Sequence, residues 1–458
     1  MTNLNNNVTN KVNTRNMVLN ILHNIFVDKA YTNIAIDKYL NEHNYLSKKD
    51  RAFITRIVEG TVENQITIDY IINQFSKTKT SKMKNTILII LRLSVYQIKY
   101  MDKVPMSAIC NEAVKLTKKR KFNNLSGFVN GVLRNIGRNV HLITFPDEKI
   151  NPIEFLSVTY SFPKWLIKMW LSQYDYETVK QICENSNKTI KTNIRCNLTK
   201  TNTLDLRKEL EKNNIEVENS DIFEYAFKIS NYDNIRSLQS FVEGKFSVQD
   251  ESSMLVGHLA SVQKNDTVID VCAAPGGKTT HVAEKLQNTG CVYSRDIYTK
   301  KLNLIKENVK RLQLNNIIVQ KHSALDLDKS LKEKADIVIA DVPCSGLGII
   351  RKKPDIKYNM TKENIDSLVS LQRDILNVVY QYVKVDGILM YSTCTINPQE
   401  NIDNIKWFID KYPEFKLVDI REELPNELNS DINGCIQLLP GFNNTDGFFI
   451  AKLRRVGI

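Results

Sequence analysis

The N-terminal third of the chain repeats apolar residues at the spacing of amphipathic helices. Three such stretches cover residues 17–25, 53–58 and 87–98. Apolar positions three and four residues apart fall on one face of a helix. Segments with helical periodicity alone pack as a bundle, so the pattern predicts an all-α domain over residues 1–140.

The pattern then changes twice before residue 250. Over residues 141–163 the periodicity fades and prolines gather, which indicates a linker, and residues 165–181 return to helix, so residues 141–189 form a linker and helical segment. Strand, helix and strand patterns follow over 192–198, 204–213 and 215–217, with further strand-like pieces up to residue 250. This order predicts a small α+β subdomain over residues 190–250.

From residue 251 onward, short apolar runs alternate with helical segments. The helical patterns cover 278–286 and 300–312, and the strand-like runs cover 268–271, 291–294, 317–320, 335–340, 388–392 and 447–453. A turn at Asp386-Gly387 is expected to precede the fifth run. This alternation is typical of a parallel sheet with helices on both faces. We therefore expect a doubly wound α/β domain, Rossmann-like in architecture, over residues 251–458.

A glycine-rich turn joins the first of these strands to its helix. Pro275-Gly276-Gly277 turns the chain sharply, and glycine lets a ligand lie against the loop. The fingerprints G-x-G-x-x-G and G-x-x-x-x-G-K-[ST] are absent, which argues against a pyrophosphate or triphosphate ligand. Asp296 follows the second strand, where such folds hold ribose hydroxyls. An adenosine ligand without phosphates fits this pattern, and S-adenosylmethionine is the common one.

Two cysteines follow neighbouring strands of the expected sheet. Cys344 comes after the fourth strand and Cys394 after the fifth, and adjacent parallel strands end at one edge. A single cysteine is most often a small buried hydrophobe, but two at neighbouring strand ends beside a methyl donor suggest covalent catalysis. A thiolate that adds to C6 of a pyrimidine makes C5 nucleophilic enough to take a methyl group. Positive charge from the sulfonium or from Lys278 would favour the thiolate.

Composition sets limits on the class of protein. The 458 residues are enough for two or three domains, and 63 Lys and Arg against 51 Asp and Glu give a net charge of +12, which favours a polyanionic partner. The eight cysteines contain no C-x-x-C pair, and residues 1–14 are polar, without the apolar core of a secretory leader. No run of about 18 apolar residues occurs. We expect a cytoplasmic protein with reduced thiols, without a metal site or a membrane span.

Several motifs resemble known families. Those of the N-terminal region resemble the NusB-like domain at the front of bacterial rRNA cytosine methyltransferases: Arg92-Leu-Ser-Val-Tyr-Gln97, Asn111-Glu-Ala-Val114 and Gly127-Phe-Val-Asn-Gly-Val-Leu-Arg134. Two further motifs, which carry the cysteines, resemble the RNA cytosine-C5 methyltransferase family of the ribosomal small-subunit methyltransferase B type, also called Sun or Fmu: residues 341–357 and 391–401. The resemblance runs nearly end to end. It implies an RNA-binding NusB-like bundle, a subdomain like an RNA-recognition module, and a methyltransferase domain that uses S-adenosyl-L-methionine.

The resemblance also implies roles for individual residues. Cys394 would be the nucleophile, Cys344 would assist release of the RNA, and Asp341 would contact the cytosine ring and the cofactor. Together with Lys278, whose charge favours the thiolate, these are the expected catalytic residues. The residues implied in cofactor binding are Cys272, Ala273, Ala274, Pro275, Gly276, Gly277, Lys278, Asp296, Ser323 and Asp341. The family carries an acidic residue after the third strand, and an ungapped match places Ser323 there, whereas a small shift in register would place Asp326 there. Arg351, Lys352 and Lys353 would either meet RNA phosphates or form a solvated basic loop.

The function implied is methylation of C5 of a cytosine in 16S rRNA. Two alternatives stay open: a tRNA cytosine-C5 methyltransferase, and an RNA-binding assembly or antitermination factor whose methyltransferase domain is inactive. The expected partner is 16S rRNA, with no DNA and no membrane, and the expected state is a monomer.

Overall fold

The computed structural model describes residues 13–426, 428 and 433–457 and divides into two compact units. The first unit contains Met1–Asn187 and Lys352–Asn359, and the second contains Lys188–Arg351 and Met360–Ile458. Residues 1–12, which include most of the segment where no leader is expected, lie outside the described residues. No helix over the described ranges is long and apolar enough to cross a membrane.

The first unit is built from helices, as the periodicity predicts. Its α-helices are α1 (Thr14–Phe26), α2 (Thr32–Glu42), α3 (Lys48–Glu63), α4 (Gln65–Phe75), α5 (Asn85–Tyr100), α6 (Met106–Lys119), α7 (Ser126–Arg138), α8 (Pro152–Tyr160), α9 (Lys164–Leu171), α10 (Tyr176–Asn185) and α16 (Ile356–Asn359). Helix α3 begins where the Ser47 side chain accepts a hydrogen bond from the Asp50 amide, and its residues Ile54 and Ile57 are fully buried. The apolar faces of α1 to α7 meet in one core.

The region between residues 141 and 185 differs from the sequence prediction. The expected linker contains α8, because Pro152 occupies the first turn of that helix, where its missing N–H costs no hydrogen bond. The expected single helix over 165–181 is two helices, α9 and α10. Asp175 ends the interruption by accepting a hydrogen bond from the Thr178 amide at the start of α10.

A segment from the C-terminal half of the sequence belongs to the first unit. Its helix α16 carries Tyr358, whose hydroxyl oxygen lies 2.8 Å from both the Glu63 carbonyl oxygen and Ser161 Oγ. Lys357 beside it is fully buried, with its Nζ 3.3 Å from Asn187 Oδ1. The basic residues 351–353 therefore lead into a partly buried helix, α16, which neither helical nor strand periodicity in the sequence predicted.

The second unit begins with a small antiparallel sheet in the strand order β2-β3-β1-β4. Its elements are β1 (Thr192–Cys196), α11 (Thr203–Lys212), β2 (Glu216–Asn219), β3 (Ala226–Ser230), α12 (Gln239–Val242) and β4 (Phe246–Val248). Leu206 and Leu210 of α11 pack against Ile194 and Ile229 of the sheet. The predicted α+β subdomain is therefore present.

The larger sheet of the second unit has the order β10-β12-β9-β8-β5-β6-β7, with β11 beside β12. The strands are β5 (Thr267–Asp270), β6 (Cys291–Asp296), β7 (Ile317–Lys321), β8 (Ala335–Asp341), β9 (Val383–Thr393), β10 (Phe415–Leu417), β11 (Cys435–Leu438) and β12 (Phe448–Arg455). Strands β5 to β9 are parallel, and β12 is antiparallel to β9. The order reverses between β5 and β8, and ligands bind in doubly wound sheets at such a switch point.

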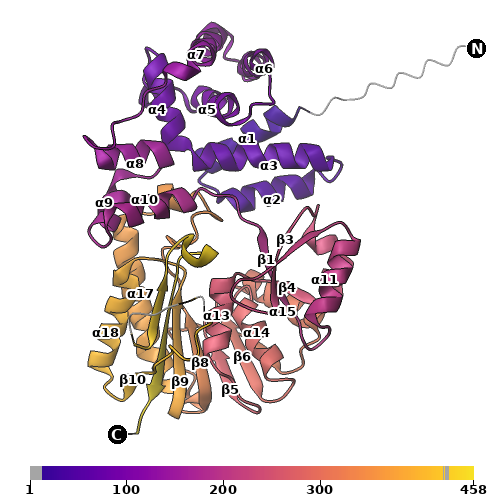
Figure 1. The fold of residues 1–458 in the computed structure, drawn as a ribbon, viewed down its shortest axis with the longest axis vertical. Helices are drawn as coiled ribbons and strands as arrows, with labels where there is room; N and C mark the ends of the chain where they lie inside the picture. Colours follow the sequence, from indigo (N-terminus) through magenta and orange to yellow (C-terminus); the bar gives the residue numbers. More distant parts are fainter. Residues whose placement is uncertain (1–12, 427, 429–432, 458) are drawn as a thin grey trace, which may run out of the picture. The chain divides into compact units, whose positions relative to one another are not determined.

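Helices cover both faces of this sheet (Figure 1). On one face lie α13 (Glu251–Leu259), α14 (Gly277–Lys285) and α15 (Thr299–Leu312), and on the other lie α17 (Lys362–Val379) and α18 (Ile402–Lys411). One expectation was wrong. Asp386 lies inside β9, in a bulge opposite β8, and not in a turn before the strand. Its φ of +64° is left-handed, and a residue in this conformation accommodates an irregular register without ending the strand pairing.

Candidate active site

The glycine-rich loop lies between β5 and α14, at the edge of the sheet where the parallel strands end. Gly276 has φ +101°, a backbone conformation that residues with a Cβ rarely adopt. The Ala273 amide donates to the Arg295 carbonyl oxygen at 2.8 Å, which holds the loop against the end of β6. Residues 272–278 and Asp296 thus lie at neighbouring strand ends, as the sequence indicates.

Asp296 is almost buried at the end of β6. One of its oxygens, Oδ1, accepts a hydrogen bond from the Tyr298 amide at 3.0 Å, which orients the carboxylate. After β7, the half-buried Ser323 accepts through Oγ from the Leu325 amide at 3.1 Å, whereas Asp326 is exposed. Burial beside β7 therefore favours Ser323 over Asp326 for a contact inside the fold.

The two cysteines of the sequence motifs are adjacent in space. Asp341 of β8 is paired in register with Ser392 of β9, so the segments that follow the two strands leave the sheet together. The Sγ atoms of Cys344 and Cys394 lie 3.2 Å apart, and the Cys394 amide donates to Cys344 Sγ at 3.3 Å. The hydrogen bond with Cys394 and burial raise the pKa of Cys344 well above its usual value, so Cys344 keeps its proton at neutral pH.

Asp341 and Lys278 connect the strand ends that carry Cys344 and Cys394 to the glycine-rich loop. Lys278 Nζ lies 2.6 Å from Asp341 Oδ2, and Ser392 Oγ donates to Asp341 Oδ1 at 2.8 Å. Lys278 is nearly buried, and the side chain of Asp341 is 30% exposed. Both oxygens of the carboxylate are therefore oriented by partners from two different elements, which fixes its direction at the strand end.

A buried carboxylate that the sequence analysis did not single out orients both cysteine segments. Glu400 is fully buried and accepts from the Ser345 amide at 2.8 Å and from the Ser345 hydroxyl at 2.5 Å. Its side chain also accepts from Asn397 Nδ2 at 3.1 Å and from Gln372 Nε2 at 3.1 Å. Ser345 follows Cys344, and Asn397 follows Cys394, so one carboxylate holds both segments. In the sequence, only its position inside the motif over residues 391–401 pointed to a role for Glu400 in the site.

Close backbone approach completes this edge of the site. The Gly348 amide donates to the Cys394 carbonyl oxygen at 3.0 Å. A Cβ at Gly348 would lie 2.0 Å from the carbonyl oxygen of Gly447, so only glycine fits there. The two segments are therefore in backbone contact as well as in thiol contact.

The basic run after Cys344 is only partly available to a polyanion. The side chain of Arg351 is 5% exposed and forms an ion pair with Asp446, which is itself 1% exposed. The expectation that Arg351 meets RNA phosphates is therefore wrong, since its guanidinium is neutralised inside the fold. Lys352 and Lys353 are exposed.

Family profiles match three successive parts of the chain. They describe the NusB family over residues 12–138, a ferredoxin-like domain of RsmF/B-like methyltransferases over residues 162–236, and the 16S rRNA methyltransferase RsmB/F over residues 258–454. The chain is 36% identical to a probable ribosomal RNA small subunit methyltransferase B of Bacillus subtilis (strain 168), over 98% of this chain and all of that one. The chain belongs to the ribosomal RNA small subunit methyltransferase B family.

Further comparisons agree with membership of the ribosomal RNA small subunit methyltransferase B family. A probable member from Synechocystis sp. is 33% identical over 97% of this chain and all of its own length. The crystal structure of PH0851 superposes with a TM-score of 0.81 at 27% identity and covers 96% of this chain and 98% of that one. The predicted family and fold class are confirmed, and so is S-adenosyl-L-methionine as cofactor.

The residues at the glycine loop fit that cofactor. Gly276 has a positive φ that residues with a Cβ rarely adopt, and the oriented carboxylate of Asp296 suits hydroxyl donors such as those of a ribose. His, Cys, Asp and Glu side chains form no group that could hold a metal ion in the part of the chain that the structure describes. The protein is thus an rRNA methyltransferase that uses S-adenosyl-L-methionine.

Proposed function

We propose that this protein methylates C5 of a cytosine in 16S rRNA through a covalent bond between Cys394 and C6. The observation that carries the proposal is the 3.2 Å separation of the Cys344 and Cys394 sulfur atoms at the strand ends beside Lys278 and Asp341. Cytosine C5 is a weak nucleophile, and a thiolate added at C6 divides one difficult step into two easier ones.

Cys394 is the nucleophile in this proposal. The high pKa of Cys344 keeps its S–H intact, so in this proposal Cys344 donates to the sulfur of Cys394, the nucleophile. The thiolate of Cys394 bonds to C6, and the electron pair of the C5–C6 double bond moves onto C5, which then takes the methyl group. The bound cofactor supplies that methyl group as an electrophile.

Cys344 and Asp341 act on the base in the steps that follow. Water takes the C5 proton, the electron pair of the C5–H bond re-forms the C5–C6 double bond, and the C6–S bond breaks to release Cys394 as a thiolate, a release that Cys344 assists. Asp341 contacts the cytosine ring and the cofactor, and its carboxylate is oriented for this by Lys278 and Ser392. Residues 272–278, Asp296 and Ser323 would hold the cofactor. The base leaves its helix to reach these groups.

Transfer of a labelled methyl group tests the proposal. The protein is incubated with methyl-labelled S-adenosyl-L-methionine and unmodified 16S rRNA transcript, and the RNA is digested to nucleosides. The label is expected in 5-methylcytidine. A parallel incubation uses unmodified tRNA. No label in 16S rRNA, label there in any other nucleoside, or label in tRNA but not in 16S rRNA would contradict the proposal.

A further inference from the structure

Arg195 of the small sheet is buried against a helix of the methyltransferase sheet. It lies in β1, paired in register with Ala226 of β3 and Ser247 of β4, yet its side chain is 1% exposed. An arginine this buried needs partners for its charge and its N–H groups. Those partners lie on α14, about 80 residues later in the chain, and beside it.

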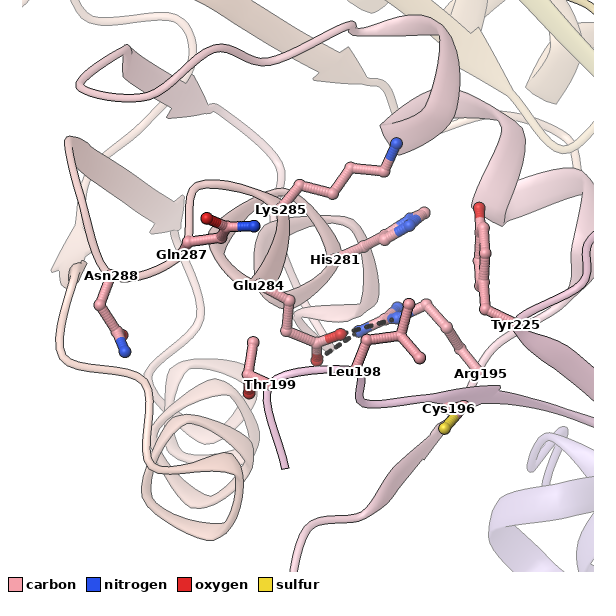
Figure 2. Close-up of a pocket in the computed structure, with 10 residues that line it drawn as sticks. All are labelled: Arg195, Cys196, Leu198, Thr199, Tyr225, His281, Glu284, Lys285, Gln287 and Asn288. Carbon is pink, nitrogen blue, oxygen red and sulfur yellow. Dashed lines mark hydrogen bonds and ion pairs between the residues drawn. The ribbon is translucent and has the colours of Figure 1, made fainter. Parts of the chain in front are cut away.

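The guanidinium contacts one face of the first two turns of α14. Nη2 and Nε donate to Glu284 Oε1 and Oε2 at 2.8 and 3.2 Å, and Figure 2 shows this paired contact. Nη1 lies 3.3 Å from the Gly277 carbonyl oxygen, and Nη2 lies 3.3 Å from Thr280 Oγ1. Residues 277, 280 and 284 recur on one side of a helix, so a single planar group contacts the helix at three levels. Nη1 also donates to Gln249 Oε1.

A cavity lies beside these contacts, next to α14. It has a volume of 470 Å³ and is lined by Arg195 and Glu284 together with Tyr225, His281 and Lys285 (Figure 2). The cavity leaves part of this side of α14 without close packing, although the rings of Tyr225 and His281 meet beside it with their centroids 5.7 Å apart. The polar contacts of Arg195 therefore add to this packing in setting the position of the helix.

The same turn of α14 carries the groups assigned to the cofactor. Gly276 and Gly277 lead into the helix, and Lys278 pairs with Asp341 at 2.6 Å. A helix moves as a rigid body over a few residues, so a shift or rotation at Gly277, Thr280 and Glu284 also displaces the loop and Lys278. A displacement of about 1 Å can cost about a hundredfold in a catalytic site.

We propose that Arg195 is a positioning residue, which holds the glycine loop in the geometry that binds S-adenosyl-L-methionine. The inference rests on the proposed assignment of residues 272–278 to the cofactor. It gives the small sheet a role in cofactor binding, in addition to any contact with RNA. Lysine cannot replace arginine here, because one ammonium group cannot reach Glu284, Thr280 and the Gly277 carbonyl in the same fork geometry.

Cofactor affinity measured by calorimetry, without RNA, tests the proposal. Arg195→Lys keeps the charge that balances Glu284 and is expected to raise the Kd for S-adenosyl-L-methionine at least about tenfold. The double variant Arg195→Met with Glu284→Leu leaves no buried unpaired charge, so it is expected to fold and to bind the cofactor as weakly. Measuring without RNA makes the result independent of which atom of the RNA is methylated.

Arg207→Lys is the matched control. Arg207 pairs with Glu211 within α11 at 3.0 Å, in the same subdomain but away from α14, and its replacement should leave the Kd unchanged. A purely structural role for Arg195 would lower the melting temperature and leave the Kd at wild-type level well below that temperature. An unchanged Kd in either folded Arg195 variant overturns the inference.

Discussion

The sulfur atoms of Cys344 and Cys394 lie 3.2 Å apart although the two residues are 50 positions apart in the sequence. Parallel pairing of β8 with β9, with Asp341 opposite Ser392, brings them together. Glu400 then holds the segment after each cysteine through Ser345 and Asn397. The register of β8 with β9 and the buried carboxylate of Glu400 therefore together bring the two thiols into contact.

Replacing Cys394 with alanine should remove methyl transfer. Without the thiol no bond to C6 forms, so the rate should fall by a factor of at least about 10³, while cofactor affinity stays at the wild-type value. Transfer of label to 16S transcript measures the rate. Cys291→Ala is the matched control, because this half-buried cysteine begins β6, at the other end of the strand from Asp296. A fully active Cys394→Ala enzyme would exclude Cys394 as the nucleophile.

Replacing Cys344 with alanine should trap the reaction part-way. Cys394 can still add to C6, but release is no longer assisted, so a covalent complex of protein and RNA is expected on denaturing gels. Addition of protease before electrophoresis should remove the shifted band. If the complex formed with Cys394→Ala and not with Cys344→Ala, the roles of the two thiols would be the reverse of those proposed.

Replacing Glu400 with glutamine should lower both stability and activity. The amide group of glutamine is a donor at one of the two positions where the carboxylate accepts, so Asn397 or Gln372 would face another donor. Hydrogen bonds to a charged group contribute about 1.5 to 3 kcal/mol each, so the free energy of unfolding should fall by about 2 kcal/mol. Chemical denaturation and kcat measure the two effects. A variant with normal stability and lower kcat would show that Glu400 acts on the chemistry alone.

Asp270 should make the stability of the second unit depend on pH. Burial raises the pKa of Asp270 to about 7, although Thr279 donates to its Oδ2 at 2.6 Å. Its folded pKa is thus higher than the unfolded value of about 4, and the folded state holds the proton more tightly between these values. The free energy of unfolding should therefore fall as pH rises from about 4 to about 7, and this contribution should be constant above pH 7, with a total of up to about 4 kcal/mol.

Asp270→Asn should remove that part of the pH dependence. The asparagine amide does not titrate, so melting temperatures of the variant at pH 5 and pH 8 should differ less than those of the wild type. The control is Asp419→Asn, because Asp419 is exposed and its pKa is lowered to about 2 by Arg421, outside this pH range. An undiminished difference in the Asp270→Asn protein would assign the pH dependence to another group.

Local patterns in the sequence were sufficient for many of the helices and strands. The helical periodicity of residues 87–98 predicts α5, and the continuous apolar run over residues 335–340 predicts β8, because both depend on neighbours in the chain. The same holds for the glycine turn before α14. Local patterns were insufficient where one residue decided the outcome, as with Pro152 at the start of α8 and the bulge at Asp386.

Only the tertiary structure decided which side chains act together. The sequence by itself determined that Cys344 and Cys394 follow strands, but their 3.2 Å separation depends on the register of β8 with β9. Nothing local shows that Arg351 is neutralised by Asp446, or that Arg195 contacts α14, because each partner comes from a distant part of the chain. Periodicity records which face of an element is buried, whereas the identity of the buried partner is a long-range property of the fold.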